Sequence, residues 1–119
     1  MQYFTITKYG DSNFNLKYDD SQLLDIISGY IQKKIAAGED YFTYFTLCKA
    51  VLKKADSENM LLDKEAYTFY ASPNLSPKEY TRISRLLWKL ILEGKIFVDF
   101  SNNAYIAHYE NDTVLGIIQ

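Results

Sequence analysis

Cationic side chains recur at helical spacing between Ser76 and Lys95, and they carry the most distinctive chemistry of this sequence. At about 100° per residue, one narrow stripe of a helix is formed by Lys78, Arg82, Arg85 and Lys89. Five basic residues lie in this stretch against two acidic ones, although the whole chain has a net charge of −2. Positive charge gathered on one helix face attracts polyanions, so the stripe predicts a nucleic-acid site.

The two residue types in the stripe suit different parts of a duplex. Arginines 82 and 85 present forked donors that match guanine edges or phosphates, whereas lysines 78 and 89 act as point charges on the backbone. If about four phosphates were neutralised, affinity would fall with roughly the fourth power of the salt concentration. The alternative is a solvated helix face, because lysine and arginine opposite an apolar side are common on any surface helix.

The remaining reactive side chains do not form a catalytic set. His108 is the only histidine and Cys48 the only cysteine, so the chain offers neither a zinc-ligand set nor an internal disulfide. Asp19, Asp20 and Asp63 suit helix caps, and five glycines supply no phosphate cradle. We therefore expect no enzymatic activity, no cofactor and no metal. A lone cysteine and short apolar runs favour a cytoplasmic protein without a membrane span.

The helix that must position the stripe has clear ends in the sequence. Ser76 is an N-cap, Pro77 stands at the first helical position, Glu79 at the third, and Gly94 ends the helix. An apolar face opposite the stripe is provided by Tyr80, Ile83, Leu87, Leu90 and Ile91. The pattern of residues 95–109 then predicts a β-hairpin, with a loop at 101–103. The tail 112–119 is apolar enough to add a strand or to pack on a partner.

The first half of the chain predicts further elements of the same domain. Apolar and polar residues alternate within 1–18, which predicts two short strands joined as a hairpin by a turn at 10–13. Helical spacing follows from 21 to 37, where Gly29 suggests a close packing neighbour. A second helix begins near Asp40 or Thr43, and its predicted inward side is Tyr44, Phe45, Cys48, Val51 and Leu52. Between 61 and 75 the pattern is ambiguous, and we favour a short helix over 63–71. With a helical part from 21 to 93, residues 1–119 read as one domain.

Residues 83–96 resemble the recognition helix and first wing strand of a winged helix-turn-helix domain. The likeness lies in the Ser84-Arg85 pair, leucines 87 and 90, the Glu93-Gly94 helix stop and Ile96 entering a hairpin. The resemblance implies an α+β fold of three to four helices with a C-terminal wing, here with an additional N-terminal hairpin. It implies that the helix enters the major groove of DNA while the wing touches the adjacent backbone or the minor groove. The DNA-facing residues would be Lys78, Thr81, Arg82, Arg85, Lys89, Asn102 and Asn103.

Two functions follow from these expectations. The first is a DNA-binding regulator of transcription, replication or segregation, working as a homodimer on double-stranded DNA, for example in a mobile element. The second is a winged-helix module that binds another protein, such as a virus-encoded inhibitor or an assembly subunit. The acidic balance, Asp99 in a wing without basic residues before its tip, and 11 tyrosines favour the second. Trp88, at the margin of the apolar face, suits a core edge or an interface.

Overall fold

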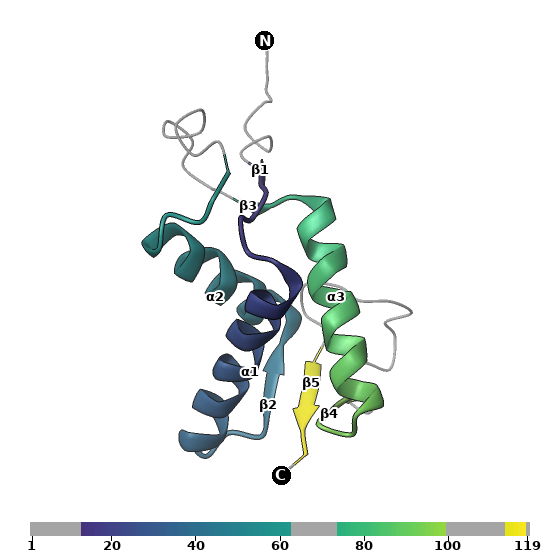
Figure 1. Ribbon diagram of the computed structural model, residues 1–119. Helices are drawn as coiled ribbons and strands as arrows, with labels where there is room; N and C mark the ends of the chain where they lie inside the picture. Colours follow the sequence, from purple (N-terminus) through teal and green to yellow (C-terminus); the bar gives the residue numbers. More distant parts are fainter. Residues whose placement is uncertain (1–12, 63–73, 100–113, 119) are drawn as a thin grey trace.

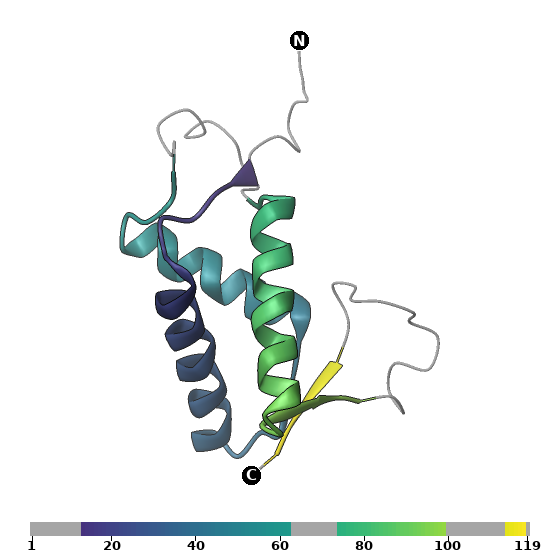
Figure 2. The same cartoon turned by 45° about the vertical axis from the view of Figure 1, so that its right-hand side comes forward.

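The computed structural model describes residues 13–62, 74–99 and 114–118, which form an α+β domain. In these ranges the helices are α1 (Asp20–Ala36), α2 (Tyr44–Ser57) and α3 (Pro77–Leu92). The strands are β1 (Asn13–Phe14), β2 (Tyr41–Thr43), β3 (Asn74–Leu75), β4 (Ile96–Val98) and β5 (Val114–Ile117). Figures 1 and 2 show α1 and α3 side by side, α2 crossing them, and the sheet of β2, β4 and β5 near the C-terminal ends of α1 and α3.

Each helix begins at a side chain that caps it. Asp19 accepts from the backbone N–H of Gln22 at 2.8 Å, and the Gln22 side chain accepts from the Asp19 N–H at 2.9 Å. Thr43 and Thr46 form the same reciprocal pair at α2. Ser76 caps α3, with Pro77 in the first turn, as the sequence predicts. These local bonds satisfy N–H groups that have no partner within the helix, so they fix where each helix starts.

The end of α3 is set by Gly94, which has a φ of 75°. That left-handed conformation suits glycine and lets the chain turn back over the last helical turn. The N–H of Lys95 donates to the Leu90 carbonyl at 3.0 Å, and the N–H of Gly94 donates to the Ile91 carbonyl at 3.0 Å. The chain therefore leaves α3 directly into β4, which keeps the helix beside the sheet.

The sheet beside the helices is antiparallel and has the order β2-β5-β4. The central strand is β5, which pairs Leu115 with Phe42 on one side and with Val98 on the other. The predictions of a strand after Gly94 and of an apolar C-terminal strand are therefore confirmed. In the described residues β4 pairs with this C-terminal strand, while the predicted wing residues 100–109 lie outside them.

Residues 13–18 pair with distant parts of the chain, so the N-terminal hairpin is not seen in the described residues. Asn13–Phe14 runs parallel to β3, and Leu16 forms an isolated bridge with Leu61. The described strand partners of residues 13–16 are therefore non-local. The first half of that hairpin, 1–12, and the predicted helix 63–71 lie outside the described residues.

The core lies where the three helices meet the inner side of the sheet. From α1 it takes Leu23, Ile27 and Ile31, and from α3 mainly Ile83, Leu87 and Leu90. In α2 one expectation was wrong: Phe45 is exposed and Leu47 is fully buried in its place. The other predicted inward positions of α2 are buried, namely Tyr44, Cys48, Val51 and Leu52. No helix in the described ranges is long and apolar enough to cross a membrane.

Candidate nucleic-acid interface

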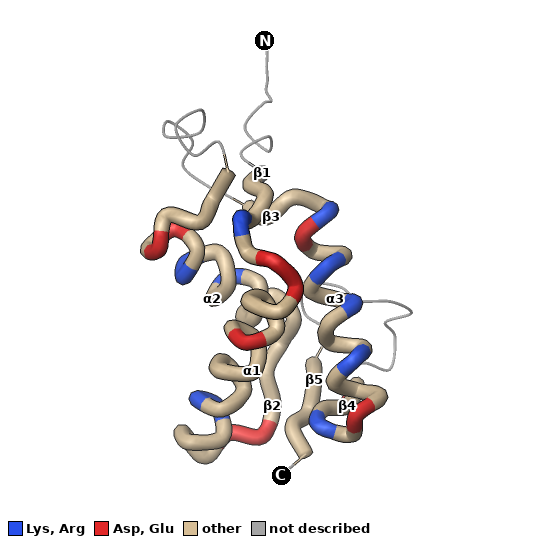
Figure 3. The backbone as a smooth tube through the Cα atoms, in the orientation of Figure 1, with Lys and Arg blue, Asp and Glu red and all other residues tan. Residues whose placement is uncertain are grey.

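Four of the predicted DNA-facing residues lie exposed along α3 and form the outer row: Lys78, Thr81, Arg85 and Lys89. They recur every three or four residues, a spacing that places side chains on one side of a helix. Figure 3 shows the basic positions of α3 following one another down the helix. Among the described residues, the three cations of the outer row have no ion-pair partner. They are therefore open to an external anion.

Arg82 does not belong to the outer row, because its guanidinium is held by the protein itself. Nη1 donates to Oε1 of Glu79 at 2.6 Å, while Nη2 contacts Oδ1 of Asp20 at 2.9 Å and donates to the Tyr18 carbonyl at 2.8 Å. Only 13% of the Arg82 side chain is exposed. Its donors are thus directed at three internal acceptors, and the predicted contact of Arg82 with DNA loses its geometric basis.

The partner that holds Arg82 is a fully buried carboxylate. Glu79 has no exposed surface, and its Oε2 accepts from the backbone N–H of Leu16 at 2.7 Å. A buried charge is costly unless it is paired and hydrogen-bonded, and both conditions are met here. We call Leu16, Tyr18, Asp20, Glu79 and Arg82 the Arg82 cluster. It fastens the segment before α1 to the first turns of α3.

The electrostatics of the Arg82 cluster keep the guanidinium charged. Burial on its own lowers the pKa of Arg82, but the hydrogen bonds to Glu79 and Asp20 outweigh it and leave the pKa above its usual value. The sequence shows an acidic residue at the third position of α3 and an arginine three residues later, which is a recognisable i,i+3 pair. Burial of that pair depends on Tyr18 and Asp20, which are distant in sequence.

The remaining predicted site residues fall near or beyond the end of α3. Asn102 and Asn103, the predicted wing tip, lie outside the described residues. Lys95, which was not among the predicted DNA-facing residues, is exposed and lies 3.5 Å from the Glu93 carboxylate, so its charge is partly compensated. The outer row is therefore the described part of the predicted interface.

Groups that could support other chemistry are buried or separated. Cys48 is 4% exposed, and burial raises the pKa of its thiol to about 12, which keeps it protonated at neutral pH. The Tyr44 hydroxyl beside it donates to the Tyr80 carbonyl at 2.7 Å. In the described ranges no three of the residue types His, Cys, Asp and Glu come together as metal ligands would. His108 lies outside those ranges.

Large apolar side chains are exposed where α3 ends and the sheet begins. Leu92 is 84% exposed, Trp88 49% and Phe97 44%. Trp88 was expected at a core edge or an interface, and its half-exposed position is compatible with both. These residues lie next to the C-terminal end of the outer row, so this end of α3 combines charge with apolar surface.

No protein-family model, curated protein or solved structure matches the chain.

Proposed function

We propose that this protein binds double-stranded DNA through the outer row of α3, as a regulatory protein of the winged-helix type. One observation carries the proposal: Lys78, Arg85 and Lys89 are exposed along α3, and the one acidic residue between Pro77 and Leu92 is buried. A helix face with cations and no exposed carboxylate attracts phosphates along its whole length. This concentration of charge contrasts with the net charge of −2 of the chain.

The order of the elements supports the winged-helix assignment. Apart from the short pair β1 and β3, the chain runs α1, β2, α2, α3, β4, β5, and β5 lies between β2 and β4. The resemblance implies a C-terminal wing beside the helix that enters the major groove. Here β4 follows α3 after a tight turn at Gly94. A duplex lying on the outer row would then meet the sheet end of the domain as well.

The basic residues of α3 have different roles in the proposed binding. Arg85 offers the forked donors that suit guanine edges or phosphates, while Lys78 and Lys89 neutralise phosphates on either side. Arg82 acts as a positioning residue, because it fixes α3 against the segment before α1. Three phosphate contacts give a salt slope of about −2.7 in log affinity against log salt. A homodimer that placed two α3 helices in successive grooves would double that slope.

The test is a fluorescence anisotropy titration of a labelled duplex of about 20 base pairs, long enough for two helical turns. Arg85→Glu with Lys89→Glu should weaken binding by at least about tenfold and reduce the salt slope by roughly two. The matched control is Lys49→Glu with Lys53→Glu, which changes the net charge equally on α2. If both pairs weaken binding alike, only overall charge matters. If neither does, α3 is not the binding surface.

A second candidate function is binding of another protein through the end of α3. The observation that favours it is the exposure of Leu92, Trp88 and Phe97, since large exposed apolar side chains are enriched at interaction sites. Leu92→Asp tests the exposed apolar surface. It should leave DNA affinity nearly unchanged if the outer row binds DNA. It should reduce self-association, measured by sedimentation, if the exposed apolar surface binds a second copy.

A further inference from the structure

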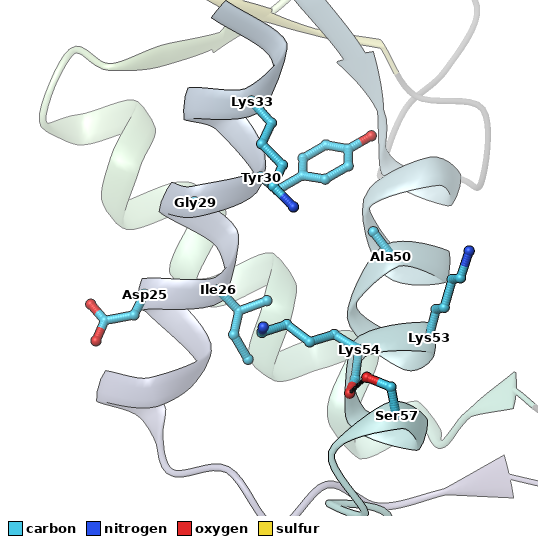
Figure 4. Close-up of a pocket in the computed structure, with 9 residues that line it drawn as sticks. All are labelled: Asp25, Ile26, Gly29, Tyr30, Lys33, Ala50, Lys53, Lys54 and Ser57. Carbon is cyan, nitrogen blue, oxygen red and sulfur yellow. Dashed lines mark hydrogen bonds between the residues drawn. The ribbon is translucent and has the colours of Figure 1, made fainter. Parts of the chain in front are cut away.

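The face of the domain formed by α1 and α2 carries a groove of about 610 Å³ between the two helices. It is lined by Asp25, Ile26, Gly29, Tyr30, Lys33, Ala50, Lys53, Lys54 and Ser57. Figure 4 looks into this α1/α2 groove and shows α3 behind the two helices that form it. The groove therefore opens away from α3, and a ligand bound there would not compete directly for the outer row.

Gly29 lines the groove, and no neighbour inside the protein accounts for this glycine. It lies in the middle of α1 and is exposed, where glycine weakens a helix relative to alanine. A Cβ built on Gly29 would meet no atom within 4 Å, so the close packing neighbour expected from the sequence is not there. Ala50 lines the groove from α2. Small residues on both walls leave space for the backbone of another chain to approach closely.

The rim of the groove is positive. Figure 4 shows the side chains of Lys33 and Lys54 reaching over the space between the helices, whereas Asp25 points away from it. Lys54 forms an ion pair with Glu58 at 2.9 Å, and among the described residues Lys33 has no ion-pair partner. The floor is apolar because of Ile26 and Ala50. This combination complements a ligand with a small apolar stripe and carboxylates beside it.

The Tyr30 side chain closes one end of the groove in a fixed position. Its hydroxyl contacts Oγ1 of Thr46 at 3.1 Å, and its ring lies edge-on to Phe42 at 5.7 Å between centroids. The Tyr30 ring is thus held between α1 and the start of α2. A groove with one rigid aromatic end and two helical walls suits an elongated occupant that lies along it.

We propose that the α1/α2 groove binds an acidic amphipathic helix of a partner protein. Small apolar side chains of that helix would lie against Ile26, Gly29 and Ala50, and its carboxylates would pair with Lys33 and Lys54. Docking a helix into a groove between two others uses anchors spaced three and four residues apart. Nothing in this inference depends on DNA binding, because the groove and the outer row lie on different faces.

A display selection tests the proposal with a library of helical peptides, selected in parallel on the wild-type protein and on Gly29→Gln. Glutamine in place of glycine fills the groove and also favours the helix, so the variant should melt no lower than the wild type. We expect a family of acidic peptides from the wild type that is absent from the selection on Gly29→Gln. Identical families from both proteins, no family at all, or groove-dependent peptides that are neutral or basic would each overturn the proposal.

The most enriched peptide, labelled with a fluorophore, then tests the lysines in the absence of DNA. Lys33→Glu with Lys54→Glu should weaken its binding by at least about tenfold, equivalent to the loss of one good contact. Lys17→Glu with Lys49→Glu changes the net charge equally outside the groove and should leave binding within about twofold. Equal weakening by both pairs would show general charge attraction and contradict the docking mode.

Discussion

Arg82 and Arg85 stand three residues apart on the same helix and play opposite parts. The guanidinium of Arg82 meets two carboxylates and a carbonyl inside the Arg82 cluster, whereas Arg85 is exposed in the outer row. A helical wheel groups them on one stripe. What separates them is the start of α1 and the segment before it, which supply Asp20 and Tyr18 on only one side of α3. The difference shows that tertiary partners decide which cation of a stripe can reach a ligand.

The Arg82 cluster and the outer row also differ in how much they contribute to the stability of the fold. The Arg82 cluster contains a buried charge that must be paired, so removing the side chain of Glu79 or Arg82 affects stability. The outer row makes few internal contacts beyond the hydrogen bond from the Thr81 hydroxyl to the Pro77 carbonyl at 3.0 Å. Its residues can therefore change for binding without disturbing folding.

Arg82→Ala should have the largest effect. It leaves the buried Glu79 carboxylate without its cation and should lower the free energy of unfolding by about 3–5 kcal/mol. Arg85→Ala on the exposed side of the same helix should stay within about 0.5 kcal/mol of the wild type. Urea denaturation followed by circular dichroism measures both. If both variants lost a similar free energy of unfolding, Arg82 would contribute no more to stability than Arg85 in the outer row.

Glu79→Gln tests the cluster more gently, because the amide keeps the shape of the side chain and can still accept from Leu16. It removes the charge that faces Arg82, so we expect a loss of roughly 1.5–3 kcal/mol in the free energy of unfolding. Crystals or amide spectra of the variant should show the segment 15–19 still in place. A variant as stable as the wild type would mean that the charge of Glu79 contributes nothing to the fold.

Gly29→Ala extends the comparison to a second exposed surface and should act in the opposite direction. The added Cβ meets nothing within 4 Å, so the free energy of unfolding should rise by about 0.5–1 kcal/mol. Gly94→Ala is the control, because its φ of 75° strains any other residue and should destabilise the protein. Thermal melts of the two variants should therefore move in opposite directions, and a fall for Gly29→Ala would reveal a contact that the structure does not show.

The smallest effect concerns pH at the contact between Tyr18 and Glu58. The Tyr18 hydroxyl donates to Glu58 at 2.5 Å and, with Lys54, lowers the pKa of that carboxyl from 4.5. A lowered pKa in the folded state stabilises the protein above 4.5, and this stabilisation is lost as the pH falls through the folded value. In Tyr18→Phe the free energy of unfolding should therefore fall less between neutral and acidic pH than it does in the wild type. Denaturation midpoints across pH measure it, with Tyr41→Phe as an exposed control.

Local signals predicted the helices well because their causes are local. Ser76 with Pro77 and the glycine at 94 fix the ends of α3 through bonds within a few residues. The pairing of Phe14 could not be read in the same way, because its partner Leu75 is far along the chain. An alternating pattern is equally compatible with a hairpin and with a strand that pairs at a distance.

The candidate site was predicted only in part, because helical spacing is a local signal and the partners of Arg82 are distant in sequence. Helical spacing correctly places Lys78, Arg85 and Lys89 on the exposed side of α3. It could not assign Arg82, since Tyr18 and Asp20 approach α3 only in the folded domain. The α1/α2 groove was missed entirely. Its signal was the glycine at position 29, which marks a place where a side chain is absent from an otherwise regular helix.

The bond between Glu79 and Leu16 joins residues 63 positions apart, and this separation bears on how the protein is made. As the chain leaves the ribosome, α1 and α2 emerge while the backbone at residue 16 still lacks its carboxylate. The final docking step must wait for the start of α3, as expected where distant contacts set the rate of folding. A nascent chain whose residue 79 is still inside the ribosome should thus be cut by proteases near position 16, whereas the released chain should resist them.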